Sequence, residues 1–218
     1  MASEQSIAPK RLAVFGGTGL TGRKIVEQAL DRGYRVTALV RSKAKLGDLA
    51  SLVDVVEGNV VDPAMVDKAV LGADAVLSAL GHAEGSPKDL ETVAIGNIVA
   101  SMSKSGVRRL VVLANTAVGT PADQPTMSQT FFRWLLKVFR KEVYDDSLGK
   151  AAVIQSTGLD WTMVRASLLK NAPPTSKYHV GRMGSGAGIR ISRGDVAEFM
   201  LKCVTEGKYI RDCPYISN

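Results

Sequence analysis

The chain has 218 residues, of which 45% are hydrophobic and 22% charged, and its formal net charge is +7. These values are ordinary for a globular protein with a core, of one large domain or two small ones. Basic residues are scattered apart from a cluster at 137–141, without a helix-turn-helix, zinc-finger or aromatic RNA-binding pattern. We therefore interpret the charge as attraction for anionic ligands such as phosphates, and expect no nucleic-acid partner.

The cysteine and hydropathy patterns indicate the cellular compartment of the protein. Cys203 and Cys213 lack CxxC spacing, which indicates a reducing compartment and no metal site. The first ten residues are polar, and no apolar run reaches 18 residues. The sequence therefore predicts a cytoplasmic protein without a signal peptide or a membrane span.

A glycine-rich turn at 14–22 follows a short apolar run at 12–15, which predicts a strand. An amphipathic run from Leu20 to Arg32 predicts a helix directly after the turn. Strand, tight turn and helix N-terminus together are typical of a site for a dinucleotide pyrophosphate, the alternative being a purely structural turn. The residues expected to bind the cofactor here are Gly16, Thr18, Gly19, Leu20 and Thr21.

The three glycines are spaced Gly-x-x-Gly-x-x-Gly, unlike the common Gly-x-Gly-x-x-Gly pattern. We expect Gly16 to let the chain turn off the strand and Gly19 to let the pyrophosphate approach the backbone. Gly22 is expected to let the helix pack closely on the sheet, and Gly33 fits the C′ position of that helix.

The first half then alternates between strand and helix patterns. Further strands are predicted at 35–40, 53–57, 75–80 and 109–113, with helices at 62–71 and 89–104 between them. Short connections between such elements predict a doubly wound, mostly parallel sheet of the Rossmann type in a three-layer αβα domain. We expect one domain over 1–218, with the cofactor half at about 10–115 and substrate-side or lid elements at about 116–218.

The second half is less regular. A polar loop at 119–128 precedes the apolar segment Phe131–Phe139, interpreted as a partly buried helix that could cover a ligand, or as a membrane-surface or partner helix. A helix at 146–156, a strand at 161–165 and an edge strand at 214–216 are also predicted. Ser192 and Asp195 have the spacing of a capping box at the start of a last helix.

The end of the second strand decides which cofactor is preferred. An acidic residue there would bind the ribose hydroxyls of NAD, but the chain has Arg41 and Ser42, followed by Lys43 and Lys45. A guanidinium with nearby cations suits the 2′-phosphate of NADP(H), which is the predicted cofactor. The alternative is a solvated surface arginine.

The loops after the third and fourth strands supply further candidates. Asn59 and Val60 are expected beside the adenine, while Leu80 and Gly81 are expected along the middle of the cofactor. His82 either contacts the substrate or is a polar loop residue. His179 has no motif around it and is expected to have no chemical role.

Four segments carry a resemblance to a known family. Residues 16–22, 39–41, 58–60 and 192–197 resemble those of the atypical short-chain dehydrogenases with NAD(P)-binding Rossmann folds. Within that group the chain looks most similar to the flavin reductase/biliverdin-IXβ reductase branch, and next to NmrA-like proteins. The resemblance spans nearly the whole chain and is more specific for fold and cofactor than for substrate.

The resemblance also implies a substrate side. Thr116 stands where the branch has a serine beside the nicotinamide, and is the implied catalytic residue. The pair at 145–146 matches two aspartates of the branch, followed here by Ser147 in place of a histidine. Ala166 replaces the proline of the usual Arg-Pro, and it is expected, with Ser167 and His82, to bind substrate.

The Tyr-x-x-x-Lys pattern of typical short-chain dehydrogenases does not occur in the sequence. Lys150 follows Tyr144 by six residues, which places it on another face of a helix. A Ser-x-x-Lys pattern occurs at 147–150 and again at 101–104, which we attribute to chance.

These features predict an NADPH-dependent reductase that transfers hydride to a planar conjugated acceptor, namely a flavin, a tetrapyrrole or a quinone. Such an acceptor spreads the negative charge it receives, so a dedicated tyrosine acid is not obligatory. The main alternative is a non-catalytic NADP(H)-binding redox sensor of the NmrA-like type, and a third possibility is a sugar or polyphenol reductase. We expect a monomer or a weak homodimer.

Overall fold

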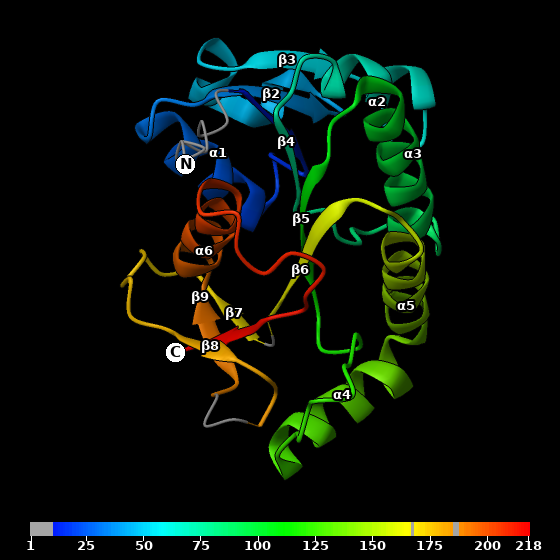
Figure 1. Ribbon diagram of the computed structural model, residues 1–218, viewed down its shortest axis with the longest axis vertical. Coiled ribbons are helices and arrows are strands. Elements are labelled where there is room, and N and C mark those ends of the chain that lie inside the picture. The colour runs from blue at the N-terminus through cyan, green and yellow to red at the C-terminus, as the bar shows by residue number, and fades with distance from the viewer. Residues whose placement is uncertain (1–10, 167, 185–187) are drawn as a thin grey trace, which may run out of the picture.

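A computed structural model describes residues 11–166, 168–184 and 188–218. Its main sheet has eight strands in the order β3-β2-β1-β4-β5-β6-β10-β8, and only β8 runs antiparallel to its neighbour (Figure 1). The order 3-2-1-4-5-6 is that of a dinucleotide-binding Rossmann fold, so the predicted doubly wound sheet is confirmed. The first six strands in the chain, all parallel, are β1 Arg11–Phe15, β2 Arg35–Val40, β3 Asp54–Glu57, β4 Ala75–Ser78, β5 Arg109–Ala114 and β6 Asp160–Arg165.

Helices cover both faces of this sheet, and alternate side chains of β1 enter the cores on the two faces. Leu12 and Val14 join the core beneath α1 (Leu20–Asp31) and α6 (Arg193–Thr205), whereas Ala13 and Phe15 join the opposite core. That opposite layer contains α2 (Pro63–Val70), α3 (Leu90–Ser105) and α5 (Lys141–Gln155) (Figure 1). Burial on both faces explains why the central strands are almost continuously apolar.

Short sequence signals mark the ends of these helices. The Asp62 side chain accepts a hydrogen bond from the Ala64 N–H at 2.9 Å, and Pro63 opens α2. Gly33 and Gly106 follow α1 and α3 with φ of +80° and +70°, a left-handed conformation that favours glycine. These signals explain why the first five strands and three helices lie close to their predicted positions.

The start of α6 differs from the predicted capping box. The Ser192 hydroxyl accepts from the Asp195 N–H at 2.9 Å, as predicted. The Asp195 carboxylate, however, accepts from the Ser192 hydroxyl and not from its backbone N–H, which donates to Asn218. Asp195 also accepts from the backbone of 175–176 and from the Asn218 amide. Buried Asp195 therefore connects the start of α6 to residues 175–176 and to Asn218.

The second half contains elements that were not predicted. A two-stranded sheet joins β7 (Leu168–Lys170) to β9 (Arg190–Ser192), and β8 (His179–Gly181) lies at the end of the main sheet. The tail forms β10 (Tyr215–Ser217) between β6 and β8, so its prediction as an edge strand is wrong. The edge position belongs to β8.

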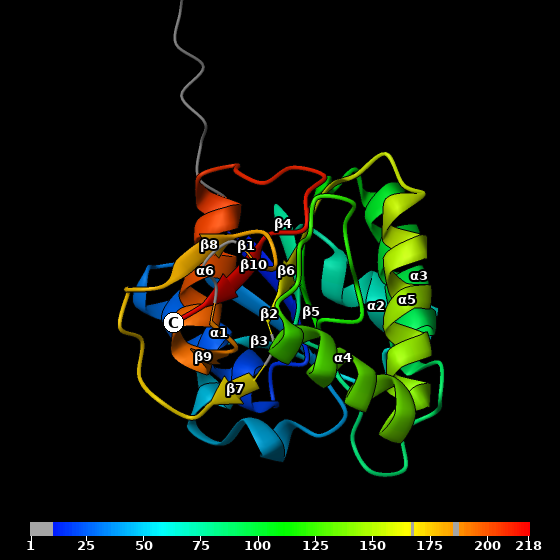
Figure 2. The same cartoon turned by 90° about the horizontal axis from the view of Figure 1, so that it is seen from below.

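Three further elements refine the prediction. A 3₁₀ segment η1 (Lys43–Ser51) follows β2, and α5 begins five residues before its predicted start. The apolar segment forms α4 (Met127–Phe139), which packs against α5 at one end of the molecule (Figures 1 and 2). Among the described residues, no helix has the length and apolar character needed to cross a membrane.

Candidate functional site: a cofactor cavity at the carboxyl edge of the sheet

The glycine-rich turn joins β1 to α1 through contacts that exclude side chains. Gly16 has φ of +81°, and a Cβ there would lie 2.7 Å from the carbonyl oxygen of Ala79. A Cβ on Gly22 would overlap the Gly16 carbonyl directly after β1, so this glycine lets the first turn of α1 lie against the backbone at the end of that strand. The turn is closed by a 2.9 Å hydrogen bond from the Gly19 N–H to the Gly16 carbonyl.

The N-terminus of α1 is open to an anion. Its N-cap residue is Gly19, which has no side chain that could cap the first N–H groups. A Cβ on Gly19 would meet only the Gly16 carbonyl, at 3.3 Å. The first turn of α1 therefore offers backbone donors and the positive end of the helix dipole.

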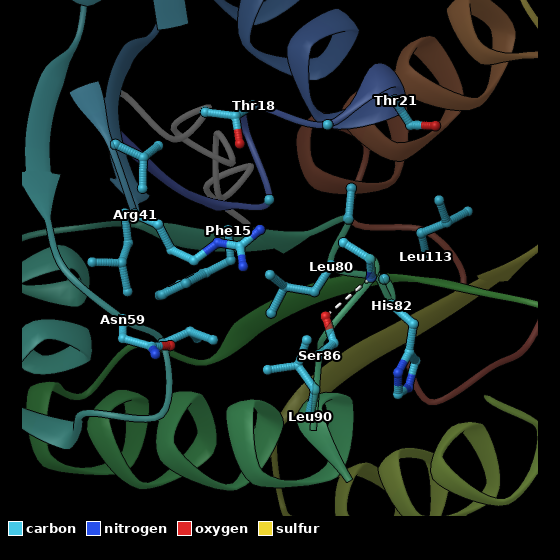
Figure 3. Close-up of a pocket in the computed structure, with 18 of the residues that line it drawn as sticks. Phe15, Thr18, Thr21, Arg41, Asn59, Leu80, His82, Ser86, Leu90 and Leu113 are labelled. Atoms are coloured by element: carbon cyan, nitrogen blue, oxygen red, sulfur yellow. Dashed lines mark hydrogen bonds between the residues drawn. The ribbon is translucent and has the colours of Figure 1, made fainter. Parts of the chain in front are cut away.

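A cavity of about 660 Å³ lies where the order of the strands reverses, between the carboxyl ends of β1 and β4 (Figure 3). Most of the predicted cofactor residues line it, and they come from four loops that follow four different strands. They are Gly16, Thr18, Gly19, Leu20, Thr21, Arg41, Asn59, Val60, Leu80 and Gly81. The predicted substrate residue His82 lines the same cavity.

Three other predicted residues, Ser42, Thr116 and Ala166, do not line this cavity. Ser42 is the N-cap of η1 and is not among the lining residues. Thr116 and Ala166 are buried near the ends of β5 and β6, also outside the lining. The Ala166 N–H donates to the Ala114 carbonyl at 3.1 Å, a bond that the proline of the related pattern could not make. Ser167 lies outside the described residues.

Arg41 extends from the end of β2 into the cavity (Figure 3). Arg41 is exposed, and no described residue forms an ion pair or hydrogen bond with its guanidinium. Lys43 and Lys45 are exposed on η1 and do not line the cavity. Arg41 is thus the cation that the protein presents to a ligand at this end of the cavity.

His82 is held by a buried carboxylate. Its Nε2 lies 2.7 Å from Asp146 Oδ2, and both side chains are at least nine-tenths buried. Asp146 also accepts from the N–H groups of Glu91 and Thr92, at 2.7 and 2.9 Å, and from the Thr92 hydroxyl. Burial alone would raise the pKa of Asp146, but these hydrogen bonds, with that of His82, lower it.

The ionised state of Asp146 fixes the tautomer of His82. A carboxylate can only accept, so His82 Nε2 carries the proton in the bond to Asp146. No described residue is hydrogen-bonded to the second ring nitrogen, Nδ1. It is therefore available to a ligand in the cavity that His82 lines.

Behind the cavity, α5 contributes polar side chains with structural partners. Lys150 pairs with buried Glu91 and donates to the Leu113 carbonyl at 3.1 Å. Buried Ser147 accepts from the Asn115 amide at 2.7 Å, and the Tyr144 hydroxyl accepts from Arg133. None of the α5 residues lines the cavity, so Ser147 and Lys150 connect helices and strands behind it.

The structure adds lining residues that were not predicted. Arg193 and Leu169 lie on one wall, and Arg193 donates to the Leu169 carbonyl at 3.0 Å. The loop 83–87 forms another part of the lining, closed by a bond from the Ala83 N–H to the Ser86 hydroxyl (Figure 3). Helix α4, interpreted from the sequence as a possible cover over a ligand, contributes no residue to the lining of this cavity. No local pattern marks these residues, since the wall forms by tertiary packing.

A buried ion pair fixes the loop after β5. Arg165 is fully buried, and its guanidinium donates to Asp123, to the Val118 carbonyl and to the Cys213 carbonyl. The N–H groups of Thr120 and Met183 also donate to Asp123. Burial opposes ionisation of Asp123, but these donors lower its pKa from 3.8 to about 2.

A Rossmann sheet with a glycine turn, an open helix N-terminus and a switch-point cavity defines a dinucleotide-binding protein. The model of a family described as NAD(P)H-binding matches residues 16–207, so the chain belongs to that family. The predicted membership among NAD(P)-binding Rossmann-fold proteins is confirmed.

Two curated plant proteins are similar in sequence. An uncharacterized chloroplastic protein of Arabidopsis thaliana is 29% identical over 94% of this chain and 75% of its own length. An isoflavone reductase homolog of Zea mays is 39% identical over 92% of this chain and 65% of its own length. The chain thus spans about two thirds of the maize protein. With a chloroplastic relative, a cytoplasmic location stays a prediction.

Two solved structures share the fold. An anaerobilin reductase of Escherichia coli, ChuY, is 19% identical with a TM-score of 0.79, covering 95% of this chain and 96% of its own. A short-chain dehydrogenase/reductase of Veillonella parvula in complex with NADP is 17% identical with a TM-score of 0.78, covering 96% and 95%. At these identities the likeness concerns the fold.

Proposed function

We propose that this protein is an NADPH-dependent reductase that passes hydride to a planar conjugated acceptor. The observation that carries the proposal is one cavity lined by the glycine turn, Arg41 and His82. The glycine turn suits the pyrophosphate of a dinucleotide, Arg41 suits its 2′-phosphate, and His82 offers a polar group to a second ligand. Membership in an NAD(P)H-binding family supports the cofactor half of the proposal.

The residues present fit NADPH. The glycine turn and the uncapped start of α1 would take the pyrophosphate, because they offer backbone donors without obstructing side chains. Arg41, which has no partner among the described residues, would pair with the 2′-phosphate. Asn59 and Val60 would border the adenine at the same end of the cavity.

The chemistry divides between cofactor and protein. When bound, NADPH supplies the hydride and is left as NADP⁺. The protein would hold the acceptor close to the nicotinamide and exclude water, which is the main source of rate in such a transfer. His82 Nδ1 would accept a hydrogen bond from an N–H or O–H group of the bound substrate, and Asp146 would keep the imidazole in its orientation. Solvent would supply the proton that completes the two-electron reduction.

Thr116 is proposed to act at the nicotinamide side through its hydroxyl. It is buried at the carboxyl end of β5, directly after Asn115, whose amide is fixed by Ser147. Since Thr116 is outside the cavity lining, we expect a supporting contribution to turnover. The maize relative, an isoflavone reductase homolog, supports the reaction class and leaves the hydride acceptor as our proposal.

Anaerobic stopped-flow spectroscopy tests the function. The purified chain is mixed with NADPH and then with FMN, biliverdin, dichloroindophenol or a quinone, while absorbance of the reduced nicotinamide is followed. We expect at least one acceptor to oxidise bound NADPH faster than the buffer control does. Fluorescence titration of NADPH and NADH on the same sample measures binding independently.

The two measurements separate the alternatives. Tight NADPH binding without oxidation by any acceptor would replace the reductase by a cofactor-binding sensor. Failure to bind either nucleotide would overturn both. Rapid oxidation of NADH with weaker binding of NADPH would keep the reductase but reverse the assignment of Arg41.

A further inference from the structure

Helix α4 presents an apolar stripe to solvent. Met127, Phe131, Trp134 and Val138 are spaced by four, three and four residues, which places them on one helical face. All four are exposed, with Met127 at 92% and Trp134 at 52%. Pro125 and Thr130 join three of them around an open hollow of about 570 Å³. Such a face is unusual on a surface helix, whose apolar side normally packs on the core.

The opposite side of α4 shows that this orientation is fixed by the fold. Gln129 is buried there, and its side chain accepts from the Thr126 N–H in a capping box that begins the helix. Phe132 and Leu136 are partly buried on the same side, and α4 packs against α5. The stripe is therefore held outward by the packing of the rest of the helix.

Positive charge accompanies the stripe. Arg133, Lys137, Arg140 and Lys141 lie within 126–141, and this stretch has no acidic residue. Lys137 and Arg140 are exposed. Lys141 pairs with Asp145 on the next helix, so the excess charge is carried by the residues of α4 and its end. An anionic surface matches this combination of exposed aromatic residues and cations.

We propose that α4 docks on the surface of a bilayer that contains anionic phospholipid. At 13 residues the helix is roughly 20 Å long, which suits a helix that lies in the interface and does not span it. Phe131, Trp134 and Val138 enter the boundary between headgroups and acyl chains, while Lys137 and Arg140 contact the lipid phosphates. The helix lies at one end of the molecule and leaves its outer face unobstructed (Figures 1 and 2).

Co-sedimentation with vesicles tests this proposal. The full chain is mixed with vesicles of phosphatidylcholine alone or with phosphatidylglycerol added. We expect partition onto the anionic vesicles and little onto the neutral ones. Trp134 is an internal reporter, because Trp161, the second of the two tryptophans, is only 7% exposed. Binding should shift the tryptophan emission to shorter wavelength.

Matched variants distinguish binding through the apolar stripe from non-specific binding of exposed apolar residues. Phe131→Gln with Val138→Gln should weaken partition at least tenfold, while Leu52→Gln with Leu71→Gln, two exposed leucines elsewhere, should leave it unchanged. Lys137→Gln with Arg140→Gln should reduce binding on anionic vesicles to the neutral level. NADPH titration of each variant verifies that the fold is retained.

Two results would overturn the proposal. Absence of wild-type partition onto anionic vesicles is one, and equal partition of the stripe variant is the other. Sedimentation velocity without lipid tests the competing occupant. If the wild type is a dimer that the stripe variant dissociates, and does not bind vesicles, the stripe is covered by a second copy of the chain.

Discussion

Arg41 and His82 line the same cavity but differ in how firmly the protein holds them. The Arg41 guanidinium is exposed and has no partner among the described residues, whereas His82 is fixed by a buried carboxylate. A side chain whose main partner is the ligand, as proposed for Arg41, should affect ligand affinity. One that is already oriented should affect the reaction more than the affinity.

Replacement of Arg41 by alanine tests cofactor preference. A charge-assisted hydrogen bond contributes about 1.5–3 kcal/mol, so NADPH affinity should fall roughly 10- to 100-fold. NADH lacks the 2′-phosphate and should bind almost unchanged. Isothermal titration calorimetry with both nucleotides measures the difference. Arg35→Ala, at the opposite end of the same strand, is the matched control. Equal losses for both nucleotides would refute the assignment.

Gly19→Ala tests the phosphate cradle. Gly19 has φ of −78°, which alanine adopts readily, and its Cβ would meet only the Gly16 carbonyl at 3.3 Å. The fold should therefore persist, while the methyl group obstructs the pyrophosphate and weakens NADPH binding about tenfold or more. Thermal unfolding and fluorescence titration give the two readouts. Gly96→Ala, where a Cβ meets nothing within 4 Å, is the control. Unchanged affinity would make the turn purely structural.

His82→Ala tests the substrate side. Asp146 holds the imidazole of His82 in a fixed orientation. Removal of the imidazole should therefore lower kcat about 10- to 100-fold and leave NADPH affinity within about twofold. Single-turnover oxidation of NADPH by the best acceptor measures the rate. The other histidine, His179, is exposed on β8, and His179→Ala should have no effect. A wild-type rate in His82→Ala would return this residue to a structural role.

At the scale of elements, the buried pair of Arg165 and Asp123 fixes the loop between β5 and α4. The folded state keeps the pKa of Asp123 near 2, below its ordinary 3.8. The unfolded chain therefore binds the proton first as pH falls. The stability contributed by this carboxylate is complete above about pH 4 and is lost between about pH 4 and 2.

Asp123→Asn should remove that contribution and leave Arg165 buried without a counter-ion. Breaking a buried pair costs about 3–5 kcal/mol, so urea unfolding at neutral pH should show a loss of that order. The variant should also lose less stability than wild type between about pH 4 and 2. Asp145→Asn removes an exposed pairing and should cost under about 1 kcal/mol. A similar small loss for Asp123→Asn would contradict this account.

Local signals predicted most of the regular elements, because each signal acts within one turn or strand. Asp62 with Pro63 marks a helix start, and Gly33 and Gly106 mark helix ends. The three-residue strands β7, β8 and β9 exist only through distant partners, so no local pattern indicates them. The same holds for the site: loops after successive strands could be placed from the fold rule, whereas the contact of His82 with Asp146 spans 64 residues.

On the scale of the whole molecule, the last strand of the chain, β10, connects β8 to the rest of the main sheet. Tyr215, Ile216 and Ser217 are fully buried in β10, between β6 and β8. Deleting residues 215–218 should expose β6, release β8 and lower the midpoint of thermal unfolding by at least roughly 10 °C, since two large buried side chains are lost. Calorimetry measures the shift. A change of a few degrees would show that β10 only covers an edge.

The junction at Asp195 has a practical consequence for protein production. One carboxylate joins the Asn218 amide to the start of α6, where Arg193 lines the cavity. An affinity tag fused directly after Asn218 should disturb the hydrogen bond from the Asn218 amide to Asp195. Because Arg193 at the start of α6 lines the cavity, such a fusion should change the measured NADPH affinity. Variants should therefore be compared without a tag at that position.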